Sequence, residues 1–209
     1  DWEKVIDKKD RTEEKLKEVV RCIYDVFKET EKYVHKDLIE GEDKLPEEIF
    51  FITTQELEDK YPEYTPKERE DAICKEHKAV FLMKVGGVLK SGEKHDGRSP
   101  DYDDWNLNGD ILFWYPLLDR AVELSSMGIR VDEKALDYQL KVSGNDDRRS
   151  LDFHRMLLSG ELPYTIGGGI GQSRICMYLL NKAHIGEVQA STWDEKNLKV
   201  CRENDINLL

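Results

Sequence analysis

Apolar residues recur every three or four positions across residues 12–35, and charged residues fill the positions between them. This spacing is typical of a long amphipathic helix that rests one face on a core. A second helix is predicted over 65–77, because Thr65 to Glu68 combines a capping threonine, a proline in the first turn and a reciprocal acid. Both helices have a start signal as well as a periodic face.

Compact apolar runs over 49–53 and 79–86 indicate buried strands. Two longer runs, which begin at Asp110 and Val122, have the spacing of antiparallel neighbours. The remaining expected elements are helices over 54–61 (capped by Thr54), 132–142 and 147–159, a strand into the glycine run near 165, a helix ending near Lys182, and polar loops over 39–48 and 91–105. Paired strands with separate helices predict an α+β fold, in which helices flank an antiparallel β-sheet.

Charge narrows the classes of partner. The 209 residues carry a formal net charge of -12, whereas nucleic-acid and membrane-surface proteins need a basic face, so we expect neither partner. No apolar run approaches the length of a membrane span. The four cysteines have neither the CxxC spacing of a zinc site nor a disulfide pattern, which favours free, buried thiols in a cytoplasmic protein.

The segment TIGGGIGQSR, residues 165–174, places four glycines within five positions, directly before a helix that carries Arg174 in its first turn. Two explanations remain open. The glycines could relieve a crowded strand crossing, or they could leave a bare strand for a nucleotide whose phosphate meets the helix start and Arg174. The segment lacks the GK[ST] of a Walker loop and the early βαβ context of a Rossmann fingerprint.

Two acids, Asp110 and Glu123, lie on adjacent predicted strands. If both point to one face, a divalent cation between them and a phosphate would relieve their repulsion. Strand alternation makes an outward, solvated position equally compatible with each acid. Arg130 shares the face of Glu123 only if a bulge intervenes, and it would then be an anion anchor or a surface cation.

The segments RSPDYDDW, LNGDI, ELSSMGIRVD, LPYTIGGGIGQSR and HIGEVQA follow one another in an order that resembles the ammonia-dependent asparagine synthetases, or aspartate–ammonia ligases. This family is related to the class II aspartyl- and asparaginyl-tRNA synthetases, and the likeness runs from the first residue to about Trp193. It implies that residues 1–209 form the C-terminal two-thirds of a single class II catalytic domain, preceded by about 110 further residues. It also implies a further loop of about ten residues between Trp105 and Asn106. Either the protein has lost this loop or the sequence omits the segment, and we expect the omission.

The resemblance implies a two-step reaction with ATP and Mg²⁺. ATP activates the side chain of aspartate as a β-aspartyl adenylate, and ammonia then displaces AMP to give asparagine. The family resemblance further implies a cytoplasmic homodimer. Two alternatives remain, namely a fragment of an aspartyl- or asparaginyl-tRNA synthetase, and a non-catalytic paralogue with the same fold.

The resemblance also assigns roles to residues. Arg174, Asp103 and Arg130 are the expected catalytic residues. The expected nucleotide site comprises Gly167, Gly168, Gly169, Gly171, Arg174 and Glu123, the metal site Asp110 and Glu123, and the aspartate site Asp1, Arg98, Tyr102, Asp103, Ser125, Ser126 and Arg130. Within that site Arg130 takes the α-carboxylate with help from Arg98, and Asp103 or Asp1 takes the α-ammonium. Ammonia itself is the nucleophile, so catalysis would consist mainly of positioning and charge stabilisation.

Overall fold

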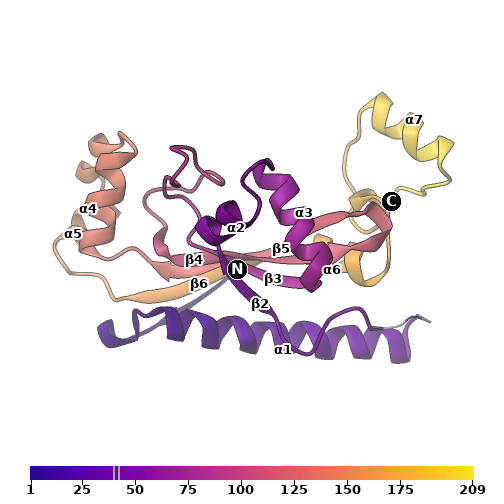
Figure 1. Ribbon diagram of the computed structural model, residues 1–209, viewed down its shortest axis with the longest axis horizontal. Coiled ribbons are helices and arrows are strands. Elements are labelled where there is room, and N and C mark those ends of the chain that lie inside the picture. The colour runs from indigo at the N-terminus through magenta and orange to yellow at the C-terminus, as the bar shows by residue number, and fades with distance from the viewer. Residues whose placement is uncertain (40, 42) are drawn as a thin grey trace.

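The computed structural model describes residues 1–39, 41 and 43–209, so the loop expected over 39–48 lies partly outside the described residues. A six-stranded sheet in the order β1-β6-β5-β4-β3-β2 separates two layers of helices (Figure 1). The strands are β1 (Trp2–Val5), β2 (Phe50–Thr53), β3 (Ala79–Met83), β4 (Asp103–Tyr115), β5 (Arg120–Arg130) and β6 (Thr165–Ile170). The α-helices are α1 (Glu13–Asp37), α2 (Thr54–Lys60), α3 (Pro66–His77), α4 (Glu133–Val142), α5 (Asp152–Leu158), α6 (Gln172–Leu179) and α7 (Glu195–Glu203).

The α+β prediction is confirmed, and the sheet is mixed. Strand β2 pairs in parallel with β3, and the other neighbouring strands pair antiparallel. Parallel neighbours need a long crossover connection, which α2 and α3 provide between β2 and β3. The expectation of a purely antiparallel sheet is therefore wrong at this edge.

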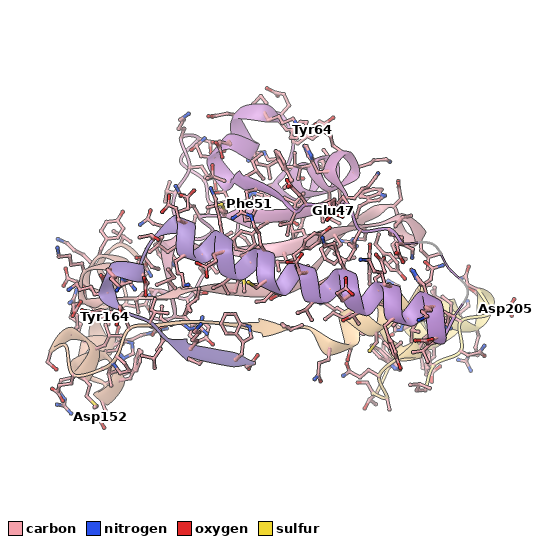
Figure 2. The ribbon with its side chains drawn as sticks, turned by 90° about the horizontal axis from the view of Figure 1, so that it is seen from below. Glu47, Phe51, Tyr64, Asp152, Tyr164 and Asp205 are labelled. Carbon is pink, nitrogen blue, oxygen red and sulfur yellow. The ribbon has the colours of Figure 1, made fainter. Side chains whose placement is uncertain are left out.

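Helix α1 runs along one face of the sheet, as Figure 1 shows from the side and Figure 2 from below. Thr12 caps it by accepting a hydrogen bond from the backbone N–H of Lys15 at 3.1 Å. The buried stripe of the helix comprises Leu16, Val20, Tyr24, Phe27, Glu31 and Val34. Tyr24 and Phe27 meet Phe113 of β4 edge-on, with ring centroids 6.0 and 5.4 Å apart. Burying each such ring contributes about 2 kcal/mol, so this face anchors the sheet.

The opposite face of the sheet carries α2 and α3 over its β2–β3–β4 half (Figure 1). Ile73 of α3 and Leu57 of α2 pack with Leu82 and Leu112 in a second apolar cluster. A third cluster, built from Val131, α4 and α5, lies at one end of the molecule. Figure 2 labels Asp152 and Asp205 at opposite ends of the long axis. Helix α3 also reaches the start of β5, where the backbone N–H of Ala121 donates to Asp71. The rest of this face along β5 and β6, called the open face below, holds the polar site.

Several local predictions need correction. Thr53, rather than Thr54, caps α2, through a reciprocal pair of hydrogen bonds with Glu56. The helix expected over 147–159 is a 3-10 turn over Asp146–Ser150 followed by α5, because Leu151 has an extended backbone. Strand β1 and helix α7 were not predicted. All four cysteines are free, but Cys22 and Cys176 are exposed rather than buried.

The segment 91–105 was expected to lie outside the core, yet β4 begins inside it at Asp103. Asp103, Asp104 and Trp105 are buried. Distant arginines compensate the two carboxylates, because Arg130 pairs with Asp103 and Arg11 with Asp104. Among the described residues, no helix is long and apolar enough to cross a membrane.

Candidate active site

A β-bulge in β5 determines which side chains share the open face. Ile111 of β4 lies opposite Ser125, but the next residue, Leu112, lies opposite Glu123, so β5 contains one extra residue at this point. The extra residue reverses the alternation of side chains along the strand. Glu123 and Arg130 are therefore on the same face of the sheet. The bulge that the sequence analysis required for a common site is present.

One end of the site is built around the Arg130 guanidinium. Its Nη1 donates to Asp103 of β4, its Nη2 donates to Tyr102 Oη at 3.1 Å, and its carbon lies 4.0 Å from the centroid of the Tyr102 ring. The side chains of Arg130 and Asp103 are 10% and 6% exposed. Burial raises the pKa of Asp103, and the charge of Arg130 only partly opposes that effect. This end presents a buried, oriented cation beside a carboxylate.

The charges continue toward the middle of the strand. Arg98 donates from Nη2 to Asp110, and the side chains of these residues are 21% and 9% exposed. Burial raises the pKa of Asp110 to about 6; Arg98 opposes this shift, and the nearby negative charge of Glu123 adds to it. The Nε of Arg98 is buried and has no acceptor among the residues that the structure describes. Within the described chain Arg98 therefore has an unpaired donor, which an anion would reach only after the neighbouring side chains move.

The other end of the site combines Arg174 with Glu123. Arg174 Nη1 donates to the backbone carbonyl of Glu123 at 2.9 Å, and it lies 3.6 Å from Glu123 Oε1. Both side chains border a groove of about 960 Å³ along β5, β6 and the start of α6. That volume is in the range of small-molecule sites. Arg174 is 47% exposed at the side chain, so its guanidinium is accessible to a ligand in the groove.

The four glycines of the run have different surroundings. A Cβ on Gly168 would lie 2.7 Å from Met127 Cβ and from Ser126 O, so this glycine relieves a crowded crossing with β5. A Cβ on Gly167 would lie 2.5 Å from Arg130 Nη2. Gly169 and Gly171 border the groove. A Cβ on Gly167 would also lie 2.6 Å from the backbone oxygen of Trp2. The crowded-crossing explanation thus applies to Gly167 and Gly168, whereas the bare strand that could support a nucleotide is limited to the 169–171 end.

The other predicted substrate residues are divided between the two ends. Asp1 and Ser126 border the groove, and Asp1 lies over Gly169. Ser125 is buried and donates its hydroxyl to Gly169 O at 2.9 Å, which ties β5 to β6. Tyr102 lies against Arg130. Along the open face the charged groups thus run from Arg130 and Asp103, through Arg98 and Asp110, to Glu123 and Arg174.

Sequence reasoning missed several residues that shape this site. Glu3 of β1 binds the Arg130 guanidinium, and Arg11 pairs with Asp104 at 2.9 Å and with Asp132 at 3.3 Å. Gln172 and Gln189 border the groove. Glu3 and Arg11 are far from their partners in the chain, so no local spacing indicates these pairs. The two glutamines fall in or near quoted motifs, but their side-chain chemistry gave no signal.

The residues fit a magnesium ion that is shared with a phosphate. Mg²⁺ is usually held by one or two carboxylates together with water and substrate phosphates. Asp110 and Glu123 supply two carboxylates, and burial raises the pKa of Asp110 despite the neighbouring Arg98. No group of three or more acidic, histidine or cysteine side chains that could hold a metal occurs among residues 1–39, 41 and 43–209. To hold a metal ion, Asp110 and Glu123 would therefore need further ligands such as water and phosphate.

Comparison with known proteins adds independent findings. A family model described as aspartate-ammonia ligase matches residues 1–205. Proteins named aspartate–ammonia ligase from Fusobacterium nucleatum and Clostridium tetani are 65% and 63% identical over 209 residues, which is 100% of this chain and 64% and 61% of theirs. A Pediococcus pentosaceus protein of the same name is 60% identical over 209 residues and is covered to 62%. The chain thus spans less than two-thirds of these relatives.

These alignments overturn one expectation. The 209 aligned positions of the Fusobacterium relative match the 209 residues of this chain, which leaves no room for an inserted loop of ten residues. The direct junction of Trp105 and Asn106 is therefore shared with that relative, and the expected missing segment is wrong. The register of β4 is irregular at this point, between Asp103 and Asn108.

Solved structures with a similar fold are class II synthetases. The aspartyl-tRNA synthetase from Entamoeba histolytica superposes with a TM-score of 0.63 at 17% identity, over 93% of this chain and 42% of that one. The asparaginyl-tRNA synthetase of the same organism, in complex with asparaginyl-adenylate, gives a TM-score of 0.56 at 16% identity, over 90% and 44% of the two chains. At these identities the likeness shows the fold alone. The match of the family model over residues 1–205 shows that the chain belongs to the aspartate–ammonia ligase family.

Proposed function

We propose that the protein makes asparagine from aspartate, ammonia and ATP through a β-aspartyl adenylate, with release of pyrophosphate and AMP. The observation that carries this proposal is the family match over residues 1–205, supported by relatives named aspartate–ammonia ligase. Because the chain spans 64% of the Fusobacterium relative, the activity is proposed for the protein that contains it. We further propose that residues 1–209 are the C-terminal two-thirds of one class II catalytic domain.

The groove end of the site would take ATP. Arg174 supplies a planar cation at the start of α6, where it can pair with phosphate or stack on adenine. Gly169 and Gly171 leave the strand bare beneath it. Asp110 and Glu123 would hold Mg²⁺, which would neutralise negative charge on the phosphates. An anionic triphosphate would otherwise be repelled by these two carboxylates.

The Arg130 end would take the amino-acid part of aspartate. Arg130 and the Nε donor of Arg98 suit a carboxylate, and Asp103 suits the α-ammonium group. Asp1, over Gly169, is a second ammonium candidate. The β-carboxylate would then point toward the groove, which Ser126 borders, and would meet the α-phosphate there.

The first step is an adenylyl transfer to the carboxylate, and the second is an acyl transfer to ammonia. A β-carboxylate oxygen attacks the α-phosphorus and pyrophosphate leaves. The ammonia lone pair then attacks the acyl carbon, AMP leaves, and the ammonium nitrogen of that intermediate gives up a proton. The side chains act by holding the reacting groups together and by compensating charge in a partly buried site.

The proposal includes a cytoplasmic homodimer that does not use tRNA. The net charge of -12 supports the absence of a nucleic-acid partner. The named relatives favour the ligase over a tRNA synthetase fragment. A non-catalytic paralogue is the remaining alternative, and the paired charges at both ends of the site argue against it.

The test measures formation of AMP and asparagine by the whole protein that contains residues 1–209. We expect both products to require aspartate, ATP, Mg²⁺ and ammonia, and to be indifferent to added tRNA. AMP formation that depends on tRNA would instead identify a synthetase. Failure to release pyrophosphate or AMP from ATP plus aspartate would identify the non-catalytic paralogue.

A further inference from the structure

Glu3 occupies the Arg130 guanidinium with the geometry of a bound carboxylate. Arg130 Nε lies 3.1 Å from both carboxylate oxygens of Glu3, and Nη2 lies 2.7 Å from Oε2. This is the two-pronged arrangement in which an arginine recognises a free carboxylate. The edge of Arg130 that best suits a substrate carboxylate is thus already filled by a side chain of the protein.

The donors of Arg130 can be counted. A guanidinium has five N–H groups. The Nε donor and one Nη2 donor bind Glu3, the other Nη2 donor binds Tyr102, and one Nη1 donor binds Asp103. A single Nη1 donor remains, but a two-pronged pair with another carboxylate needs two parallel donors. A substrate carboxylate must therefore displace an existing partner.

Burial decides which partner leaves most readily. The side chain of Asp103 is 6% exposed, so removal of its cation would leave a carboxylate buried and unpaired. Within the described residues the side chain of Glu3 is 47% exposed, and it extends from β1, opposite Gly167. On release, its carboxylate can regain water with little change elsewhere. Displacement of Glu3 is consequently much less costly than displacement of Asp103.

Gly167 preserves the space for this exchange. A Cβ at this position would lie 2.1 Å from Glu3 Oε2 and 2.5 Å from Arg130 Nη2. Any other residue would push the two charged groups apart. The backbone oxygen of Trp2 would also lie 2.6 Å from such a Cβ, so the glycine at 167 serves both the close approach of β1 and the Glu3–Arg130 pair.

The geometry points to Glu3 as an internal competitor that caps Arg130 in the ligand-free protein and is displaced by the α-carboxylate of the amino-acid substrate. The identity of that substrate rests on the proposed function. A ligand that cannot form both prongs leaves Glu3 in place, so the cap favours a carboxylate presented beside an ammonium group that Asp103 can hold. Glu3 is in this sense a specificity-determining residue.

The test compares Glu3→Gln with wild type, using the full protein and aspartate as the probe. The variant keeps the shape of the side chain and removes its charge. We expect the dissociation constant for aspartate, measured by calorimetry, to fall about fivefold, which corresponds to about 1 kcal/mol. KM for aspartate should fall similarly with kcat and KM for ATP unchanged. Glu29→Gln, a charge loss at a 74% exposed position on α1, is the matched control and should change neither constant.

A second measurement does not depend on the substrate. Phenylglyoxal modifies accessible guanidinium groups, and mass spectrometry of the peptide that contains Arg130 gives the rate. We expect modification to be several-fold faster in Glu3→Gln than in wild type, and aspartate to protect both. Equal rates would overturn the cap, as would weaker aspartate binding by the variant, which would make Glu3 a residue that orients Arg130. A wild-type protein that neither binds nor turns over aspartate would refute the proposed function. The rates of Arg130 modification would still test whether Glu3 covers Arg130.

Discussion

Gln139 of α4 should hold the segment that carries Tyr102 and Asp103. This side chain is 1% exposed, and its amide makes three hydrogen bonds to backbone. It donates to Pro100 O at 2.9 Å and to Asp103 O at 3.0 Å, and it accepts from the backbone N–H of Trp105 at 2.9 Å. The perturbation of choice is Gln139→Ala, which removes all three bonds at once.

The magnitude follows from these contacts. Each hydrogen bond contributes about 1 kcal/mol net, and the backbone groups left behind are buried. We therefore expect the free energy of unfolding to fall by about 3 kcal/mol. For a protein of this size each kcal/mol lowers Tm by about 2 to 4 °C, so the total shift is about 6 to 12 °C. Gln139→Glu should be at least as damaging, because a carboxylate has no N–H to donate to the two carbonyls.

The assay is urea unfolding followed by circular dichroism, together with steady-state kinetics. Lys141→Ala, on an exposed position of the same helix, is the control and should change stability by less than about 0.5 kcal/mol. Loosening residues 100–105 should raise KM for aspartate more than KM for ATP. If Gln139→Ala were as stable as the control and its KM for aspartate were unchanged, the three hydrogen bonds would not be what holds residues 100–105.

Three further predictions concern the charged groups along the open face. Arg174→Ala should lower ATP-dependent turnover by at least about 100-fold, as expected for loss of a charge-assisted phosphate contact. Its Tm should stay close to that of Arg155→Ala, a control at a 60% exposed arginine. Unfolding of Arg174→Ala, or unchanged turnover, would contradict this prediction. Burial raises the pKa of Asp110 from 3.8 to about 6, so the folded state binds the carboxyl proton more tightly than the unfolded state does. The resulting stabilisation, roughly 3 kcal/mol, is present below about pH 4 and is lost as the pH rises through 6. Asp110→Asn should flatten that slope in urea titrations at pH 4 to 7, and an unchanged slope would refute the assignment. Removing Mg²⁺ with a chelator should abolish AMP formation, and added Mg²⁺ should restore it; full activity in excess chelator would count against the Asp110–Glu123 metal site.

The elements that the sequence predicted well have their signal within one segment. Helix α1 repeats its apolar stripe because one side lies on the sheet along its whole length. The start of α3 was predicted because its cap, proline and acid occupy four consecutive positions. Strand β1 was missed because four residues with a half-buried tryptophan and three exposed positions give no usable alternation.

The site was predictable only as far as its partners are local or carried by a motif. The Glu3–Arg130 pair joins residues 127 positions apart, and the Arg11–Asp104 pair joins residues 93 positions apart. A polar run such as 101–104 looks solvated when its distant arginines are unknown, so the burial of Asp103 and Asp104 could not be predicted. The family motifs directed attention to Arg98, Asp110, Glu123 and Arg174, but their roles in binding stay predictions until the assays above are done.

The additional residue in β5 at Leu124 makes the strand intolerant of one kind of mutation. Deleting that residue alone would restore regular pairing with β4, but it would also turn every later side chain through half a rotation. Met127 and Ile129 would then leave the apolar core, and Arg130 would point into the core between the sheet and α1. Such a deletion would impair both folding and substrate recognition. We therefore expect a one-residue deletion in β5 to be tolerated only with a second length change that restores the original face of each side chain.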